Sequence, residues 1–260
     1  MRCYIVDAFS DTPFCGNPAA ICVLEDFLED TLMQKIAIEH NLSETAFIVK
    51  QDSGDCALRW FTPAKEIDLC RHATLASAFV VMNIIESHAK AVHFHTKSGI
   101  LKVIKNGSLF EMDFPSFQLT PISVTQEMSE AIGYMPQKAY LGRDSVCILD
   151  ENQVINATPD IAKVKHLQGE LLHITSKGSK YDIVSRSFAP KHGVAEDPVC
   201  GSGHCHLVPL WSEILNRAKI TAYQASKRGG VLYCEYQKER VKLAGKAYLY
   251  SINDIQNLSS

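Results

Sequence analysis

The segment of residues 196–205, Glu-Asp-Pro-Val-Cys-Gly-Ser-Gly-His-Cys, gathers acids, thiols, glycines and a hydroxyl where an apolar helix is expected to begin. The first N–H groups of a helix have no partner within the helix, and the helix dipole adds positive charge there. Such a helix start suits a carboxylate or a phosphate. An ordinary cap by Asp197, with the glycines making the turn, explains the same residues. The segment alone leaves both interpretations open.

An earlier part of the chain repeats this pattern. Residues 61–63 (Phe-Thr-Pro) precede residues 68–72 (Asp-Leu-Cys-Arg-His), and residues 188–190 (Phe-Ala-Pro) precede residues 197–202 (Asp-Pro-Val-Cys-Gly-Ser). Each copy is followed by an apolar run. A duplicated half-domain has this appearance, and it predicts two helix starts directed at one cleft. Because the match is short, chance similarity is the alternative.

Two cysteines, Cys70 and Cys200, occupy equivalent places in these copies. If both face one cleft, they can act as the thiol and the thiolate of a two-base racemase that needs no cofactor. The start of a helix lowers the pKa of a thiol, as such chemistry requires. The alternative is that both are small buried apolar residues.

A metal site is the next chemistry to weigh. Cys200 and His204 are four residues apart, with Cys205 and His206 beside them, and all are zinc-ligand types. No C-x-x-C or H-E-x-x-H spacing accompanies them, so we expect no metal. No G-x-G-x-x-G, P-loop or G-x-S-x-G motif supports nucleotide binding or serine hydrolysis.

The composition excludes other classes of protein. The chain has 260 residues, 46% of them apolar and 21% charged, and a net charge of −3, which argues against a nucleic-acid partner. No apolar run reaches the roughly 20 residues that span a bilayer. The first residues alternate like a strand rather than like a signal peptide. Nine cysteines, an odd number without paired spacing, predict reduced thiols and a cytoplasmic location.

The elements that position these residues follow from the apolar spacing. We expect a helix over residues 30–40, a break, and a strand over 46–50, so that Glu44 lies at the edge of a strand. A surface carboxylate is the ordinary interpretation of such a residue. The helix over residues 72–87 is apolar nearly all round and is therefore expected to be buried. Strands are predicted at 91–96, 100–106 and 108–114.

The second half is expected to follow a linker at residues 115–121. A helix over 125–133 capped by Thr125, a short helix opened by Thr158-Pro159-Asp160, and a strand over 241–249 are predicted there. Pro209 is expected to kink the second central helix or to shift its start. The halves are placed at residues 1–117 and 118–260.

Taken together, these segments resemble the phenazine-biosynthesis (PhzF-like) family, within the diaminopimelate-epimerase-like superfamily. The matching segments are residues 7–9 (Asp-Ala-Phe), 16–19 (Gly-Asn-Pro-Ala), 41–45 (Asn-Leu-Ser-Glu-Thr), 59–63 (Arg-Trp-Phe-Thr-Pro), 68–70 with 72–76, and 196–199 with 201–202. They occur in the family's order along most of the chain.

The resemblance implies an α+β fold of two similar halves, each a curved mixed or antiparallel sheet around a central helix, with the active site in the cleft between them. It implies an isomerase that acts on a small carboxylate-bearing substrate without metal or organic cofactor, typically as a homodimer. Glu44 corresponds to the acid/base. His72, Asp197, Gly201 and Ser202 correspond to the lining of the site, with helix-start amides for the substrate carboxylate.

General chemistry is consistent with that assignment. A base that removes a proton from carbon benefits from a raised pKa, which a water-poor cleft gives a glutamate. Negative charge that develops on the substrate is stabilised by helix dipoles and N–H donors already in place.

Two residues depart from the family pattern. Arg71 stands where glycine is usual, and it either binds a substrate carboxylate or fills the pocket. Cys200 stands where threonine is usual and resembles the second thiol of the two-thiol epimerases. Three hypotheses follow: a Glu44-dependent isomerase, an amino-acid racemase or epimerase using Cys70 and Cys200, and a non-catalytic protein that binds small anions.

Overall fold

The computed structural model describes residues 1–256, which form an α+β protein of two compact units. Of the described residues, the first unit contains Met1–Met112 together with residues 244–256, and the second contains Asp113–Leu243. The chain therefore passes twice between the units. Each unit is described by itself below.

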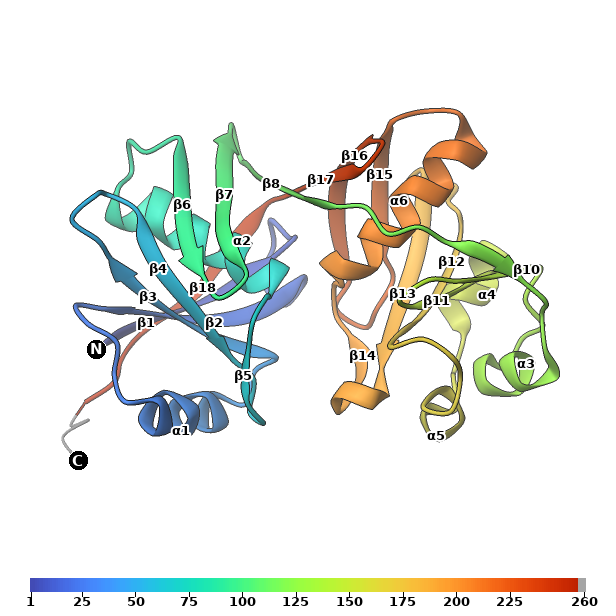
Figure 1. Cartoon of the computed structure of the whole chain (residues 1–260), viewed down its shortest axis with the longest axis horizontal. Helices are drawn as coiled ribbons and strands as arrows, with labels where there is room; N and C mark the ends of the chain where they lie inside the picture. The colour runs from blue at the N-terminus through green and yellow to red at the C-terminus, as the bar shows by residue number, and fades with distance from the viewer. Residues whose placement is uncertain (257–260) are drawn as a thin grey trace. The chain divides into compact units, whose positions relative to one another are not determined.

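The first unit is a mixed sheet with two helices (Figure 1). Its elements are β1 (Arg2–Ala8), β2 (Asn17–Leu24), α1 (Asp30–His40), β3 (Glu44–Lys50), β4 (Cys56–Phe61), β5 (Glu66–Ile67), α2 (Arg71–Val80), a π-helical turn (Val81–Ile85), β6 (Ala91–Thr96), β7 (Gly99–Asn106), β8 (Leu109–Pro115) and β18 (Ala247–Asp254). The predicted strands and the helix over 30–40 are confirmed to within about two residues.

Helix α2 is the centre of the first unit. Every residue of α2 except Phe79 is buried, and the strands of the unit curve around it (Figure 1). This is the burial that its all-round apolar sequence predicts. The predicted helix over 72–87 continues as the π-helical turn and stops at Ile85.

The second unit has the same plan around α6 (Figure 1). Its elements are β9 (Thr120–Ile122), α3 (Gln126–Ile132), β10 (Lys138–Leu141), β11 (Ser145–Ile148), α4 (Glu151–Asn156), α5 (Ile161–Val164), β12 (Leu172–Lys177), β13 (Ile183–Ala189), a 3₁₀ turn (Pro190–His192), β14 (Val194–Asp197), α6 (Gly201–Leu215), β15 (Lys219–Gln224), β16 (Gly230–Gln237) and β17 (Arg240–Gly245).

Pro209 lies inside α6, which continues unbroken to Leu215. Proline lacks the N–H that the carbonyl of Cys205 would accept in a regular helix. Instead, the backbone N–H of Phe117 donates to that carbonyl at 3.0 Å. The predicted effect of Pro209 is thus offset by a segment outside the helix.

The pairing of the strands confirms the duplication. In the first unit β1/β2 is antiparallel, β2/β3 parallel, β3/β4 antiparallel, β4/β6 parallel and β6/β7 antiparallel. In the second, β10/β11, β11/β12, β12/β13, β13/β15 and β15/β16 follow the same order of orientations. Each central helix follows a hairpin formed by the fourth strand and a short extra one.

Each of the two hairpins contains an equivalent arginine–glutamate ion pair, which the sequence analysis missed. Arg59 donates to both carboxylate oxygens of Glu66 at 2.8 and 2.9 Å, and Arg186 donates to both oxygens of Glu196 at 2.7 and 2.9 Å. Each arginine stands two residues before the phenylalanine of its motif, and each glutamate four residues before the cysteine. Bidentate pairs of this kind fix geometry as well as adding energy. They tie each hairpin at the same distance from its helix start.

The structure differs from several sequence predictions. The boundary at 117/118 and the placement of the chain's last strand in the second half are replaced by the units above, because β18 pairs along β1. The predicted strand over 241–249 is two strands, β17 and β18. The short helix near residue 160 begins after Asp160, whose carboxylate accepts from two N–H groups, and Pro159 precedes it.

The cysteines also differ from expectation. Cys3 and Cys22 form a disulfide, because they are directly opposite each other on the antiparallel strands β1 and β2. The other seven cysteines are free, as predicted. The sequence separation of 19 residues carried no signal of this pairing.

Candidate active site

The first cluster of predicted residues lies at the start of α2. Glu44 begins β3, and its Oε2 lies 2.8 Å from Nε2 of His72 on the first turn of α2. The side chains of Glu44 and His72 are 14% and 8% exposed, so the pair is largely shielded while the carboxylate retains some contact with solvent. The surface interpretation of Glu44 therefore does not apply.

Asn17 holds the other side of the imidazole, with its Nδ2 3.2 Å from Nδ1 of His72. Asn17 is the first residue of β2 and is fully buried. Gly16 before it has φ of +73°, and a Cβ there would lie 2.2 Å from the carbonyl oxygen of Ala8. Only glycine fits that turn. The Gly-Asn-Pro-Ala segment contained this signal, but Asn17 was not among the predicted site residues.

The charges around His72 keep it protonated. Burial by itself lowers the pKa of His72, but the charges of Cys70 and Glu44 outweigh it and raise the pKa well above the usual value. Burial and the charge of Glu44 raise the pKa of Cys70, which is therefore a thiol at neutral pH. Of the two neighbours, the Glu44 carboxylate is thus the charge that holds the proton on His72.

Cys70 is the N-cap residue of α2, and its Sγ lies 3.5 Å from Nδ1 of His72. Its carbonyl accepts hydrogen bonds from the backbone N–H and the hydroxyl of Thr74, which close the first turn. Arg71 follows as a buried residue of that turn. The structure thus brings Glu44, Cys70 and His72 together, with Arg71 on the same helix start.

The second cluster lies at the start of α6. Asp197 ends β14, and its Oδ1 accepts from the backbone N–H of Val199 at 3.1 Å. The buried Gln224 on β15 holds both ends of this loop: its Nε2 donates to the carbonyl of Asp197 at 2.6 Å, and its Oε1 accepts from the N–H of Cys200 at 2.8 Å. Sequence reasoning missed Gln224, because a glutamine at the end of a strand carries no pattern.

Cys200 caps α6 with its side chain. Its Sγ accepts from the N–H of Gly203 at 3.4 Å and lies 3.3 Å from the hydroxyl of Ser202. Burial, and then the charge of Asp197, raise the pKa of the Cys200 thiol. Burial likewise raises that of Cys70, so both thiols shift opposite to the expectation from a helix start alone.

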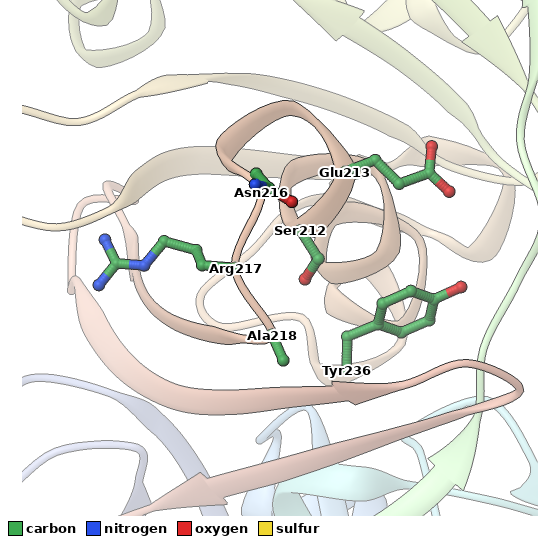
Figure 2. Close-up of a pocket in the computed structure, with 6 residues that line it drawn as sticks. All are labelled: Ser212, Glu213, Asn216, Arg217, Ala218 and Tyr236. Atoms are coloured by element: carbon green, nitrogen blue, oxygen red, sulfur yellow. The ribbon is translucent and has the colours of Figure 1, made fainter.

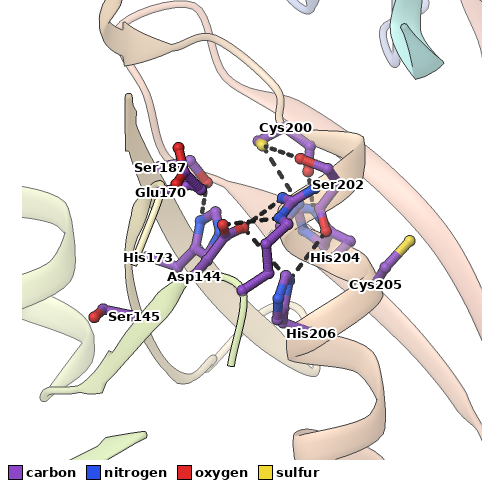
Figure 3. Close-up of polar contacts among 12 residues, drawn as sticks. Asp144, Ser145, Glu170, His173, Ser187, Cys200, Ser202, His204, Cys205 and His206 are labelled. Carbon is purple, nitrogen blue, oxygen red and sulfur yellow. Dashed lines mark hydrogen bonds and ion pairs between the residues drawn. The ribbon is translucent and has the colours of Figure 1, made fainter. Parts of the chain in front are cut away.

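A buried network of polar side chains packs against the start of α6 (Figure 3). At its centre is the fully buried carboxylate of Asp144, whose Oδ2 lies 2.9 Å from Nε2 of His173 and 3.6 Å from Nδ1 of His206. Arg143 donates to the same carboxylate, and Ser187 lies 2.9 Å from Nδ1 of His173. Burial by itself raises the pKa of Asp144, but the hydrogen bonds from His173 and Arg143 lower that pKa by more. The net pKa is below the usual value, so Asp144 is ionised.

The imidazole of His173 lies directly under the first turn of α6. A Cβ at Gly203 would meet the ring at 2.6 Å. Nδ1 of His206 lies 3.3 Å from the carbonyl of Ser202, on the same turn. Burial lowers the pKa of His206 to about 4, so this ring is neutral. The network thus fixes the turn that carries Gly201 and Ser202.

The zinc alternative lacks a geometric basis at Cys200. Nδ1 of His204 donates to the backbone carbonyl of Cys200 at 2.8 Å rather than sharing a site with its thiol. Within residues 1–256, three groups of histidine, cysteine and acidic residues have ligand atoms within 4.8 Å of one another, and none of them contains Cys200 or His204.

A surface pocket of about 330 Å³ lies at the other end of α6 (Figure 2). It is lined by Ser212, Glu213, Asn216, Arg217, Ala218 and Tyr236. None of these is a predicted site residue.

Comparisons with known proteins agree with the resemblance found in the sequence. The model of the family described as phenazine biosynthesis-like protein (PhzC-PhzF) matches residues 6–251. A protein of Pseudomonas aeruginosa named an uncharacterised isomerase is 43% identical over 246 residues, which cover 94% of this chain and 95% of that protein.

Solved structures give the same result. A PhzF-family protein of Enterococcus faecalis has a TM-score of 0.94 and 47% identity and covers 96% of this chain and 97% of its own. A putative PhzC/PhzF protein of Clostridium difficile has a TM-score of 0.93 and 45% identity and covers 99% and 100%. No helix within residues 1–256 is long and apolar enough to cross a membrane. The chain belongs to the phenazine biosynthesis-like (PhzF) family and is an isomerase of that family.

Proposed function

We propose that this isomerase moves a proton between carbon atoms of a small carboxylate-bearing substrate, with Glu44 as the acid/base. In the proposed step the Glu44 carboxylate takes a proton from carbon, and the electron pair of the C–H bond delocalises into the substrate's conjugated system. Protonated Glu44 then returns the proton to a second carbon. The atoms and electrons of the substrate are conserved, so the step needs no co-reactant.

The observation that carries this proposal is the Glu44–His72 contact of 2.8 Å in a largely shielded position. His72 stays protonated because its pKa is raised, so a positively charged ring lies against the side chain that we propose as the base. Asn17 fixes the ring from the other side at 3.2 Å. A base held by buried partners loses little freedom on reaching the transition state.

The substrate carboxylate is proposed to bind at helix starts. The first N–H groups of α2 and α6 lie beyond the helices' own hydrogen-bond ladders, and the helix dipoles favour an anion there. His72, Arg71, Gly201 and Ser202 stand in these first turns, and Asp197 shapes the loop before α6. We propose these residues as the substrate-binding set. The homodimer stays a prediction from the family resemblance, and the cytoplasmic location stays a prediction from the cysteine usage.

The test is exchange of carbon-bound protons in deuterated water. The probe is a panel of small carboxylic acids with an activated C–H bond, including cyclic and unsaturated 2-amino acids, followed by proton NMR and by mass. Glu44→Gln is expected to lose at least about 10²-fold in exchange rate, the usual contribution of a general base. Glu39→Gln, at an exposed glutamate of α1, is the matched control and is expected to exchange normally.

The same assay separates the two-thiol racemase. Cys70 and Cys200 are both helix N-caps, the placement on which that alternative rests. Exchange that survives Glu44→Gln but is lost in both Cys70→Ser and Cys200→Ser would refute the Glu44 assignment. Because burial raises the pKa of both thiols, we expect the opposite.

A further inference from the structure

One buried glutamine, Gln224, holds the loop before α6 at both of its ends. Its Nε2 donates to the carbonyl of Asp197 at 2.6 Å, and its Oε1 accepts from the N–H of the N-cap residue Cys200 at 2.8 Å. A carbonyl only accepts and an N–H only donates, so these partners fix which end of the carboxamide is which. The loop is therefore spanned by a single planar group that is fully buried.

The backbone of Gln224 is itself fixed by the sheet. Gln224 is the last residue of β15, where it pairs with Gly230 of β16 on one side and with Ser185 of β13 on the other. The N–H of Ala225 donates to the carbonyl of Ser185 at 2.8 Å. A group carried by a paired strand is held more precisely than one carried by a loop. The loop before α6 is thus tied to the sheet of its own unit.

This arrangement decides which N–H groups at the start of α6 are available. The N–H of Cys200 is taken by Gln224, and that of Gly203 by Sγ of Cys200. Within the part of the chain that the structure describes, the backbone N–H groups of Gly201 and Ser202 donate no hydrogen bond. Such unpaired N–H groups at a helix start are the ones that bind an anion. Two successive donors suit the two oxygens of a carboxylate.

A serine provides a further tie to this loop, and both repeats have it. Ser98 donates to the carbonyl of Asp68 at 2.8 Å, and Ser226 donates to the carbonyl of Pro198 at 2.7 Å. Each carbonyl lies two residues before a cysteine cap. Each serine lies two residues after the strand that runs parallel to the fourth strand of its unit. The loop before each central helix is therefore held by an equivalent serine.

The carboxamide of Gln224, in contrast, distinguishes the second repeat from the first. The last residue of β6, Thr96, stands at the equivalent place. Its hydroxyl donates to the carbonyl of Gly99 in its own turn at 2.7 Å rather than to the loop before α2. The tie through a buried carboxamide therefore belongs to the second repeat, whereas the Glu44–His72 pair belongs to the first.

We propose that Gln224 is a positioning residue of this isomerase, which keeps the N–H groups of Gly201 and Ser202 in place for the substrate's carboxylate. Without its side chain, the N–H of Cys200 and the carbonyl of Asp197 each lose a buried hydrogen bond, and the start of α6 is free to shift. A shift of about 1 Å in a site costs up to about 10²-fold. The inference rests on the proposed function, because that function puts a carboxylate at this helix start.

Binding is tested by titrating isotope-labelled protein with the acids of the exchange panel and following the amide NMR signals of Gly201 and Ser202. In wild type we expect at least one acid to shift both signals to saturation. Gln224→Met fills a similar volume without either hydrogen bond and is expected to weaken that binding at least about tenfold. Gln237→Met, at the exposed last residue of β16, is the matched control and is expected to bind like wild type. Equal affinity in Gln224→Met, or a panel that shifts neither signal in wild type, overturns the proposal.

The variant Gln224→Glu separates positioning from a merely structural role. A protonated carboxyl donates and accepts as the carboxamide does, whereas an ionised one only accepts. At low pH we therefore expect Gln224→Glu to bind the same acid as tightly as wild type does at that pH. Once the introduced carboxyl ionises, binding should become weaker than in wild type. Weak binding by Gln224→Glu even at low pH contradicts the positioning role.

Turnover distinguishes failure of this proposal from failure of the proposed function. In label exchange, Gln224→Met is expected to raise KM at least about tenfold and to change kcat less than about threefold, because the carboxylate is bound in both the ground state and the transition state. A loss confined to kcat overturns the positioning role. If an acid binds at Gly201 and Ser202 but wild type exchanges none of the panel, the proposed function fails while the positioning of this helix start stands.

Discussion

The Gly203→Ala substitution tests whether the Asp144 network fixes the start of α6. A Cβ at residue 203 would lie 2.6 Å from Cε1 and 2.8 Å from Nδ1 of His173, well inside van der Waals contact. The ring cannot retreat freely, because Asp144 and Ser187 hold its two nitrogens at 2.9 Å each and all three residues are fully buried.

The expected magnitude follows from opposing terms. Alanine in place of glycine inside a helix stabilises by about 1 kcal/mol. Overpacking a closed core costs about 1–3 kcal/mol. Moving the ring of His173 breaks one of its buried hydrogen bonds, at a further cost of about 1–3 kcal/mol. We therefore expect Gly203→Ala to destabilise the second unit by about 1–5 kcal/mol.

Fluorescence can follow that unit by itself. The chain has two tryptophans, Trp60 in the first unit and Trp211 in the second, where its Nε1–H donates to Thr175 on β12 at 3.0 Å. Urea unfolding of Trp60→Phe, with and without Gly203→Ala, reports the change at Trp211.

The His173→Ala background supplies the matched control. Without the ring, the cost of Gly203→Ala should disappear and the helix-forming gain of alanine should remain. A Gly203→Ala protein as stable as its parent, or about 1 kcal/mol more stable, would refute the close contact.

Three further outcomes are expected. Asp144→Asn should lower the stability toward urea by about 1–3 kcal/mol, because this fully buried carboxylate accepts hydrogen bonds from His173 and Arg143. Asp113→Asn, in an exposed ion pair with Arg240, should change that stability by less than about 1 kcal/mol. Because the pKa of His72 is raised in the folded protein, its contribution to stability is complete below about pH 6.5 and is lost as the pH rises through the folded-state pKa. In urea unfolding, wild type should therefore be more stable than His72→Gln at low pH. That difference in the free energy of unfolding should shrink by up to about 1.4 kcal/mol per pH unit above pH 6.5. Denatured protein should alkylate at seven cysteines without reductant and at all nine after reduction, as counted by mass, and reducing the Cys3–Cys22 disulfide should cost about 3 kcal/mol of stability.

Local patterns allowed much of the fold to be predicted. The helix over 30–40 and the strands around α2 follow from apolar spacing, and the buried course of α2 follows from its lack of a polar face. The duplication was visible because Cys70 and Cys200 follow similar motifs, and strand pairing confirms it. These features depend on residues close together in the chain.

The features that were missed depend on contacts between distant residues. Asp144 and His173 are 29 residues apart and meet only because β11 and β12 are parallel neighbours. Gln224 reaches the loop before α6 from a strand that follows the helix. The disulfide between Cys3 and Cys22 needs the register of β1 against β2. The spacing of apolar residues along the sequence does not show which distant residues will come into contact.

The two repeats place different residues at equivalent positions, and the difference bears on mechanism. Thr45 pairs with Phe61, and Leu172 pairs with Phe188, so Glu44 corresponds to Leu171 and Ala46 to His173. Counting from the cysteine caps, His72 corresponds to Ser202 and Ala73 to Gly203.

The second repeat therefore has neither member of the Glu44–His72 pair. At the positions of Ala46 and Ala73 it has His173 and Gly203, so an imidazole fills the space of a missing methyl group and is buried on Asp144. The pair that we propose as the acid/base is thus formed in the first repeat, and the equivalent positions of the second repeat do not form it. A Glu44–His72 pair in one repeat alone fits the proposed reaction, in which the same group removes and returns the proton. A two-base racemase, in contrast, needs a second acid/base, and burial raises the pKa of the Cys200 thiol that would have to supply it.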